Sequence, residues 1–287
     1  MNLELKNKAF LVADAHENDE NQGFLEFLQA LNSGNLEIFN GKKQSENLEI
    51  PKNKTKKNNE TPNSKTLATP QLIIMGDMFD VLVGEIKATH KFAAPYVNLL
   101  ESLAERGVEV LYLEGNHDFN LANLFEKVKV FPLQNQPLIL KCAQNLTLKK
   151  AKFTQNEVKF SKEKAEFQGV SNAALSHGDI FLPPILAFLL KTLRKPLLLK
   201  CLNLLDSLAF GKFSAKIKEN QKQKNLFYNI ENFKEIAAQR YDKYRLNGAL
   251  VVEGHYHQDA FISSEARKYI NLPTFAHERS FFVVECD

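Results

Sequence analysis

Short polar clusters follow apolar, strand-like runs at five points along this 287-residue chain. Five of the seven histidines lie in four of these clusters, and the fifth cluster carries two aspartates. The clusters are Asp14-Ala15-His16, Gly76-Asp77-Met78-Phe79-Asp80, Gly115-Asn116-His117-Asp118, Ser176-His177-Gly178-Asp179 and Gly254-His255-Tyr256-His257. Because an α/β protein binds its ligands at the carboxyl edge of its sheet, the pattern predicts an α/β fold whose polar loops converge there.

The first half of the chain alternates strand and helix patterns. Residues 88–106 have apolar side chains at helical spacing and stop at Gly107, as a helix with a C-terminal glycine does. Short apolar runs on either side predict buried strands. These runs lie at residues 8–13, 71–75 and 108–113.

The second half changes in periodicity. Short runs between residues 128 and 175 predict antiparallel strands separated by polar turns, and residues 180–247 predict a helical insertion. Residues 248–253 predict another buried strand, and residues 258–287 two or three closing strands. Residues 33–69, rich in Lys, Asn, Glu and Thr, predict a flexible polar insertion.

Composition narrows the class of protein. The 44% hydrophobic content and the length fit one globular domain over residues 1–287. Three well-separated cysteines, with no CxxC, argue against a disulfide framework or a thiolate zinc site and favour a reducing compartment. Positive charge is concentrated: residues 41–69 carry seven Lys and three Glu, and residues 181–224 carry eight Lys, one Arg and two acidic residues. This concentration indicates an anionic partner.

The residue types in the clusters are those of a metal site. Asp14 and His16 are two residues apart at a strand end, so both side chains point to the same side, and His255 and His257 share that spacing. Each cluster alone is weak, since an isolated loop histidine is usually structural, but five in this order favour a two-metal site. Carboxylate, imidazole and amide donors without thiolate favour Mn, Fe, Zn or Mg. The remaining donors are Asp77, Asn116 and His177.

The ordered set of clusters resembles the calcineurin-like metallophosphoesterase superfamily. The resemblance covers residues 8 to about 285 apart from the 33–69 insertion, and it implies a four-layer α/β-β/α sandwich with a two-metal centre at the strand ends. By motif, Asp77 would bridge two ions, one bound by Asp14, His16 and His257 and the other by Asn116, His177 and His255.

The same resemblance implies a hydrolytic role. Two cations would activate a water for in-line attack on phosphorus and neutralise the phosphoryl oxygens. His117 would stabilise the transition state or protonate the leaving oxygen, and Asp118 would orient His117.

The segment from residue 181 to 213 bears on the substrate. Leucines and phenylalanines alternate there with basic residues, and Pro196 predicts a break between two helices. Its longest apolar run, residues 180–190, is too short to cross a bilayer. The helices could pack as ordinary core, lie in a membrane interface, or line an acyl-chain pocket beside the metals, and the number of leucines favours lipid contact.

Within the superfamily, this helical insertion resembles that of the UDP-2,3-diacylglucosamine pyrophosphatases of lipid A synthesis. That resemblance implies cleavage of UDP-2,3-diacylglucosamine to lipid X and UMP, with Mn²⁺ as the expected metal, by a cytoplasmic protein bound peripherally to the inner membrane. The alternatives are a soluble metallophosphoesterase acting on nucleotides, nucleic acid or phosphoprotein, and a non-catalytic module at the membrane. Nucleic acid is not expected, because no aromatic residues are interleaved with the basic segment at 41–69.

Overall fold

The computed structural model describes residues 3–34, 36–39, 68–155, 157–223, 225–226 and 228–286, with backbone only for 37–39. These residues form a mixed α/β fold with seven α-helices and three sheets, which confirms the predicted α/β class. Most of the predicted 33–69 insertion lies outside the described residues. Its described beginning is ordered: helix α1 (Gly23–Ser33) ends there, and strand β2 (Glu37–Phe39) follows.

The larger sheet has eight strands and carries the first three clusters. Strands β1, β3, β5 and β7 are parallel neighbours, so their carboxyl ends lie at one edge. All four residues of β3 and all three of β1 are buried, as expected of strands covered on both faces. The order is β2, β10 (Glu157–Phe167), β9 (Leu146–Thr154), β15 (Ser280–Cys286), β1 (Phe10–Val12), β3 (Gln71–Ile74), β5 (Glu109–Leu113) and β7 (Lys129–Phe131).

The second sheet has five strands and carries the last two clusters. Its three central strands, β11, β12 and β14, are parallel, and an antiparallel strand borders each side. The order is β13 (Ala260–Ser263), β14 (Lys268–Asn271), β12 (Leu250–Glu253), β11 (Asn172–Ser176) and β8 (Leu138–Lys141). A separate two-stranded ribbon pairs β4 (Leu82–Val83) with β6 (Asp118–Phe119).

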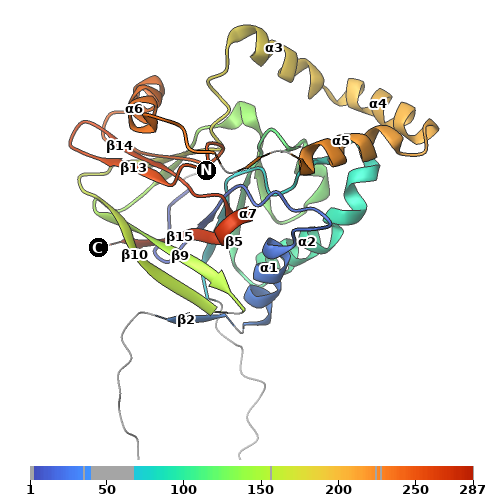
Figure 1. The fold of residues 1–287 in the computed structure, drawn as a ribbon. Coiled ribbons are helices and arrows are strands. Elements are labelled where there is room, and N and C mark those ends of the chain that lie inside the picture. Colours follow the sequence, from blue (N-terminus) through green and yellow to red (C-terminus); the bar gives the residue numbers. More distant parts are fainter. Residues whose placement is uncertain are drawn as a thin grey trace, which may run out of the picture.

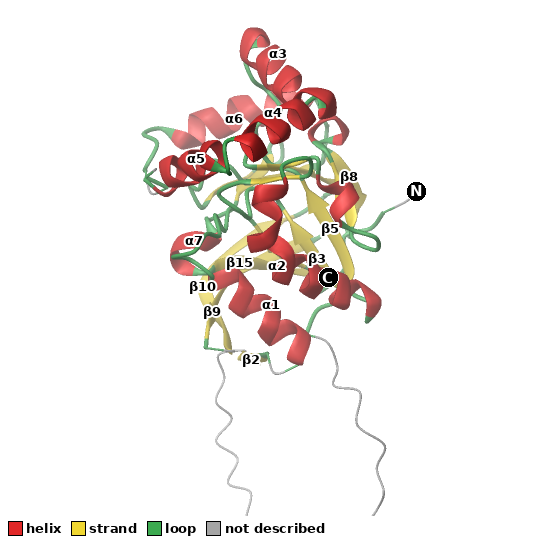
Figure 2. Cartoon of the chain, turned by 90° about the vertical axis from the view of Figure 1, so that its right-hand side faces the viewer, coloured by secondary structure: helices red, strands yellow, loops and turns green. Residues whose placement is uncertain are grey.

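Alternation along the strands divides the core into three parts. In β1, Leu11 belongs to the apolar cluster shared by both sheets, whereas Phe10 and Val12 pack with α1 and α2 (Lys87–Glu105). On the second sheet, Val251 and its neighbours pack against α6 (Phe233–Tyr244). Helices therefore cover the outer faces of both sheets, and the inner faces contact each other (Figure 2).

Several sequence-based assignments need correction. The strands predicted at 8–13, 71–75 and 108–113 are confirmed as β1, β3 and β5, and the helix at 88–106 is confirmed as α2. However, β7 is parallel to β5, and β11 is antiparallel to β8 but parallel to β12. Strand β9 was not predicted, because lysines interrupt its alternation of buried and exposed positions.

The described residues of the predicted insertion at 180–247 form four helices, α3 (Pro184–Leu193), α4 (Pro196–Leu208), α5 (Lys212–Lys222) and α6. The predicted break is confirmed: Pro196 is the first residue of α4, a position where its missing N–H costs no hydrogen bond. Helices α3 and α4 extend away from the sheets (Figure 1). Among the described residues, no helix has the length and apolar character needed to span a bilayer.

Candidate metal centre

The five polar clusters meet where the carboxyl ends of the two sheets lie together. Among the residues that the structure describes, two groups of side chains could each hold a metal ion, and within each group the candidate ligand atoms lie within 4.8 Å of one another. The first consists of Asp14, His16 and His257, and the second of Asp77, His177 and His255. The groups adjoin, because the backbone N–H of His255 donates to Asp14 Oδ2 at 3.0 Å.

In the first group, each histidine has a ring nitrogen available to accept a cation. His257 Nε2 lies 3.3 Å from Asp14 Oδ1, and its Nδ1 donates to the carbonyl oxygen of Leu226 at 2.9 Å. Since Nδ1 must carry the hydrogen of that bond, Nε2 is the atom left for a metal. His16 is buried, and neither of its ring nitrogens has a hydrogen-bond partner within the described residues. Buried polar atoms without partners are costly, and a bound cation would satisfy His16.

The second group is built around His177. Its Nδ1 donates to the carbonyl oxygen of Met75 at 2.8 Å, which directs Nε2 to Asp77 Oδ2 at 3.2 Å. Asn116 Oδ1 lies 3.3 Å from the same Nε2, and His255 Nδ1 lies 3.2 Å from it. The structure therefore brings Asn116, predicted as an amide ligand, beside the three residues of this group.

The electrostatics favour bound positive charge. Burial raises the pKa of Asp77, but His177 and His117 outweigh it and hold that pKa well below the usual range. Burial lowers the pKa of His177, yet Asp77 raises it well above its ordinary value. Burial and then repulsion by His177 lower the pKa of His255. Asp77 and His177 therefore stabilise positive charge between them, and a divalent cation bound there would supply it.

The ligand loops have a strained backbone. Asp14, His16, Asp77, His255 and His257 all have φ between 46° and 65°, in the left-handed region that non-glycine residues seldom adopt. Such strain clusters at functional sites because the surrounding structure enforces it.

Gly115 shows how closely the loops approach. A Cβ atom at this position would lie 2.2 Å from Asp77 Oδ1, so only glycine lets the loop after β5 pass the carboxylate of the loop after β3.

The structure alters the predicted role of one residue. His117 lies beside the first group, with its ring centroid 5.1 Å from that of His16, and its Nδ1 donates to the carbonyl oxygen of Asp80 at 2.8 Å. The expectation that Asp118 orients His117 is wrong. In the described chain, the buried Asp118 carboxylate instead accepts from the backbone N–H groups of Asp77, Met78 and Gly115 and from the Tyr112 hydroxyl.

A buried network behind the centre was not predicted. Arg240 donates to both carboxylate oxygens of Glu253 at 2.6 Å and to the carbonyl oxygen of Gly178 at 2.6 Å. Tyr244 and Tyr269 also donate to Glu253. Arg240 thus links Glu253, which precedes Gly254, to Gly178 in the loop that carries His177. The sequence signal for this network was Glu253, which ends the apolar run 249–253, because a buried carboxylate requires hydrogen-bond or charged partners.

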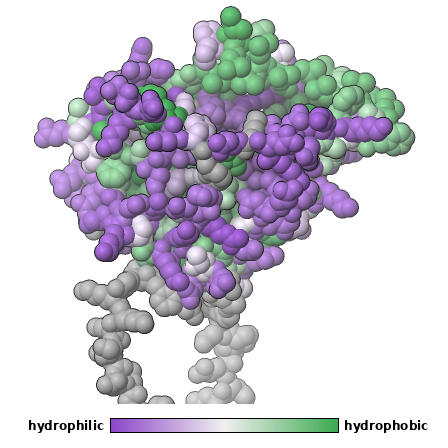
Figure 3. Space-filling view, viewed as in Figure 1, coloured by the Kyte–Doolittle hydropathy of each residue, from purple (hydrophilic) through white to green (hydrophobic). Residues whose placement is uncertain are grey.

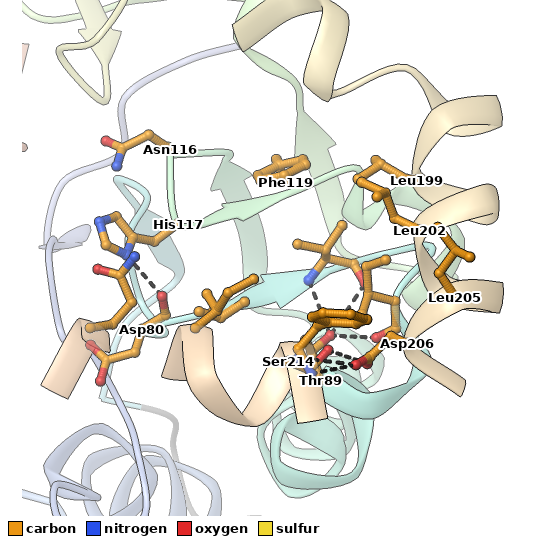
Figure 4. Close-up of a pocket in the computed structure, with 16 residues that line it drawn as sticks. Asp80, Thr89, Asn116, His117, Phe119, Leu199, Leu202, Leu205, Asp206 and Ser214 are labelled. Atoms are coloured by element: carbon orange, nitrogen blue, oxygen red, sulfur yellow. Dashed lines mark hydrogen bonds between the residues drawn. The ribbon is translucent and has the colours of Figure 1, made fainter. Parts of the chain in front are cut away.

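An apolar cavity of about 560 Å³ opens beside the centre. Asn116 and His117 lie at one end, and Leu199, Leu202 and Leu205 of α4 lie at the other (Figure 4). The helical insertion thus supplies one wall of a pocket that reaches the candidate reaction centre.

Two adjoining groups of carboxylate and imidazole donors suit divalent ions that accept oxygen and nitrogen ligands. The chemistry available to such a pair is polarisation of a phosphoryl or carbonyl oxygen and activation of water. Comparison of the chain with protein-family models and with curated protein sequences found no match.

Proposed function

We propose that the protein is a metal-dependent phosphohydrolase of the calcineurin-like metallophosphoesterase type. The observation that carries the proposal is the meeting of seven predicted ligands from five loops at one edge of the paired sheets. The order of layers also supports it, since α1 and α2, the two sheets and α6 follow one another as in the four-layer sandwich expected for that superfamily.

The proposed centre holds two divalent cations, with Mn²⁺ as the expected metal. Asp14, His16 and His257 would hold one, while Asn116, His177 and His255 would hold the other, with Asp77 shared. When bound, such a pair lowers the pKa of water and offsets the charge of phosphoryl oxygens.

The proposed role of His117 follows from its hydrogen bond. Because the carbonyl oxygen of Asp80 can only accept, Nδ1 of His117 carries a hydrogen and Nε2 is the atom that can give or take a proton. The ring lies next to His16, so Nε2 would serve the leaving oxygen of a substrate bound at the first group. Asp118 contributes by fixing the backbone around Asp77, not by contacting the proton donor.

The apolar cavity supports a lipid-bearing substrate, and we propose UDP-2,3-diacylglucosamine, cleaved to lipid X and UMP. An acyl chain gains about 0.8 kcal/mol per buried methylene group, so a cavity lined by Leu199, Leu202 and Leu205 beside His117 would hold such chains tightly.

The outer surface of α3 and α4 supports a membrane partner, and we propose the cytoplasmic face of the inner membrane. Phe188, Leu197 and Leu204 are 68%, 77% and 61% exposed. Figure 3 shows hydrophobic residues gathered over this part of the molecule. Large exposed apolar patches mark interaction sites, and nearby Lys191 and Lys195 would meet anionic headgroups.

The substrate is tested by incubating the Mn²⁺-loaded protein with UDP-2,3-diacylglucosamine in detergent and following UMP by mass spectrometry. We expect UMP and lipid X, and no product from Asp14→Ala. Absence of product from the wild-type chain, with a simple aryl phosphodiester still hydrolysed, would refute this substrate but keep the hydrolase.

The membrane partner is tested by flotation with liposomes containing anionic lipid. Phe188→Ser with Leu204→Ser should reduce the floated fraction, whereas Phe261→Ser, a half-exposed aromatic on β13, should leave it unchanged. If Phe188→Ser with Leu204→Ser floats to the same extent as Phe261→Ser, α3 and α4 are not the membrane-binding surface.

A further inference from the structure

A second, polar cavity lies on the other side of the first metal group. It has a volume of about 320 Å³, and His257 forms part of its wall. The ring centroids of His117 and His16 are 5.1 Å apart, and those of His16 and His257 are 5.4 Å apart. His117 borders the apolar cavity, so the three rings run from one cavity to the other across the first group.

The lining of the polar cavity offers a flat aromatic face and unused polar atoms. Tyr228 is 46% exposed, and its ring centroid lies 6.4 Å from that of His257. Within the described part of the chain, neither its hydroxyl nor the neighbouring Asn229 carboxamide makes a hydrogen bond. The ring is therefore open to stacking, and two polar groups beside it are available to a ligand.

The cavity does not suit an isolated anion. Lys150, which lines it, is already paired with Asp259 and with Glu163 at 3.0 Å, and Glu278 lies 4.0 Å away. Carboxylates therefore outnumber the lysine, and they accept hydrogen bonds from hydroxyl groups but repel phosphate. A ligand that fits this lining has a planar ring to stack on Tyr228 and hydroxyl groups to donate to the carboxylates. A nucleoside, in which a base is joined to a ribose, has both.

The loop that carries Tyr228 is held in place by the ligand loop. Gln258 accepts from the backbone N–H of Ile230 at 2.8 Å and donates to the carbonyl oxygen of Tyr228 at 2.8 Å. His257 Nδ1 donates to the carbonyl oxygen of Leu226. The backbone at Tyr228 is thus fixed relative to a metal-ligand residue by contacts that do not involve the Tyr228 side chain.

We propose that this cavity binds the nucleoside part of the substrate, with the base on Tyr228 and ribose hydroxyls near Asp259 and Glu278. The inference rests on the proposed hydrolase function, because the phosphorus must lie at the metal groups. It assigns the two arms of the substrate to opposite sides: the apolar arm to the cavity beside His117 and the nucleoside to the cavity beside His257.

The test compares two phosphodiesters with the same leaving group on the Mn²⁺-loaded full chain. One is thymidine 5′-(p-nitrophenyl phosphate), and the other is methyl p-nitrophenyl phosphate, which lacks the nucleoside. We expect a KM at least about fivefold lower for the nucleoside ester, the lower end of what base stacking on an aromatic ring contributes. Tyr228→Ala should bring the KM ratio close to one, Tyr228→Phe should preserve it, and Phe261→Ala should leave it unchanged.

Equilibrium binding decides the inference independently of turnover. By isothermal titration calorimetry, uridine 5′-monophosphate should bind the Mn²⁺-loaded chain at least about fivefold more tightly than ribose 5-phosphate, and Tyr228→Ala should remove that difference. Equal binding of the two ligands, or a preference that persists in Tyr228→Ala, would overturn the inference. Hydrolysis of neither ester would count against the proposed function, and the binding comparison would still decide the nucleoside site.

Discussion

Replacement of Arg240 by methionine should destabilise the protein strongly. Arg240 and Glu253 are 5% and 0% exposed, and the guanidinium donates to both carboxylate oxygens at 2.6 Å. Methionine keeps much of the side-chain volume but leaves the Glu253 carboxylate without its counter-charge. It also removes the donor to the carbonyl oxygen of Gly178.

The size of the effect follows from burial. Removing one partner of a buried ion pair costs about 3–5 kcal/mol, because the remaining charge is uncompensated. The hydroxyls of Tyr244 and Tyr269 still donate to Glu253, which places the expected loss near the lower end, about 3 kcal/mol. For a chain of 287 residues, a loss of about 3 kcal/mol corresponds to a fall in Tm of roughly 5 °C.

The measurement is urea unfolding followed by circular dichroism on EDTA-treated protein. Arg267→Met is the matched control. Arg267 pairs with Asp242, which lies on the same helix as Arg240, but the two side chains are 41% and 54% exposed, so the loss should stay below about 1 kcal/mol. Adding Glu253→Gln to Arg240→Met should recover part of the loss by removing the buried charge. A loss below about 1 kcal/mol for Arg240→Met, or no recovery in the double variant, would refute the reasoning.

Three further predictions concern catalysis and pH. His117→Ala should lower kcat by about 10²–10⁴-fold while metal content, measured by mass spectrometry, stays constant; loss of bound metal instead would make His117 a structural residue. EDTA should abolish hydrolysis and Mn²⁺ restore it, and activity that survives exhaustive chelation would contradict the metal-dependent mechanism. Burial raises the pKa of Glu17 to about 7, despite hydrogen bonds from Phe24 and Tyr96. The folded state therefore binds the Glu17 proton more tightly than the unfolded state, whose pKa is 4.5. The stability that this proton binding contributes is fully present below pH 4.5 and is lost as pH rises through about 7. Glu17→Gln should therefore unfold at higher urea concentration than wild type at pH 8 but not at pH 4.5, and a pH-independent difference would contradict this assignment.

Features encoded by neighbouring residues could be predicted from the sequence. Strands β1, β3 and β5, helix α2 and the break before Pro196 follow from apolar periodicity and from the missing N–H of proline. The pairing partner and direction of each strand could not be predicted in the same way. The run at β7 was expected to be antiparallel but pairs in parallel with β5, because pairing depends on the path of the whole chain.

The candidate site shows the same division. The sequence by itself determined which donors stand at strand ends, and the structure brings Asp14, His16 and His257 together, with Asp77, His177 and His255 beside them. Only the tertiary structure decided that Asp80, not Asp118, holds His117 and that Arg240 neutralises Glu253. The physical reason is that strand-end positions are set by local periodicity, whereas a hydrogen-bond partner is chosen by distance in space between residues far apart in the chain.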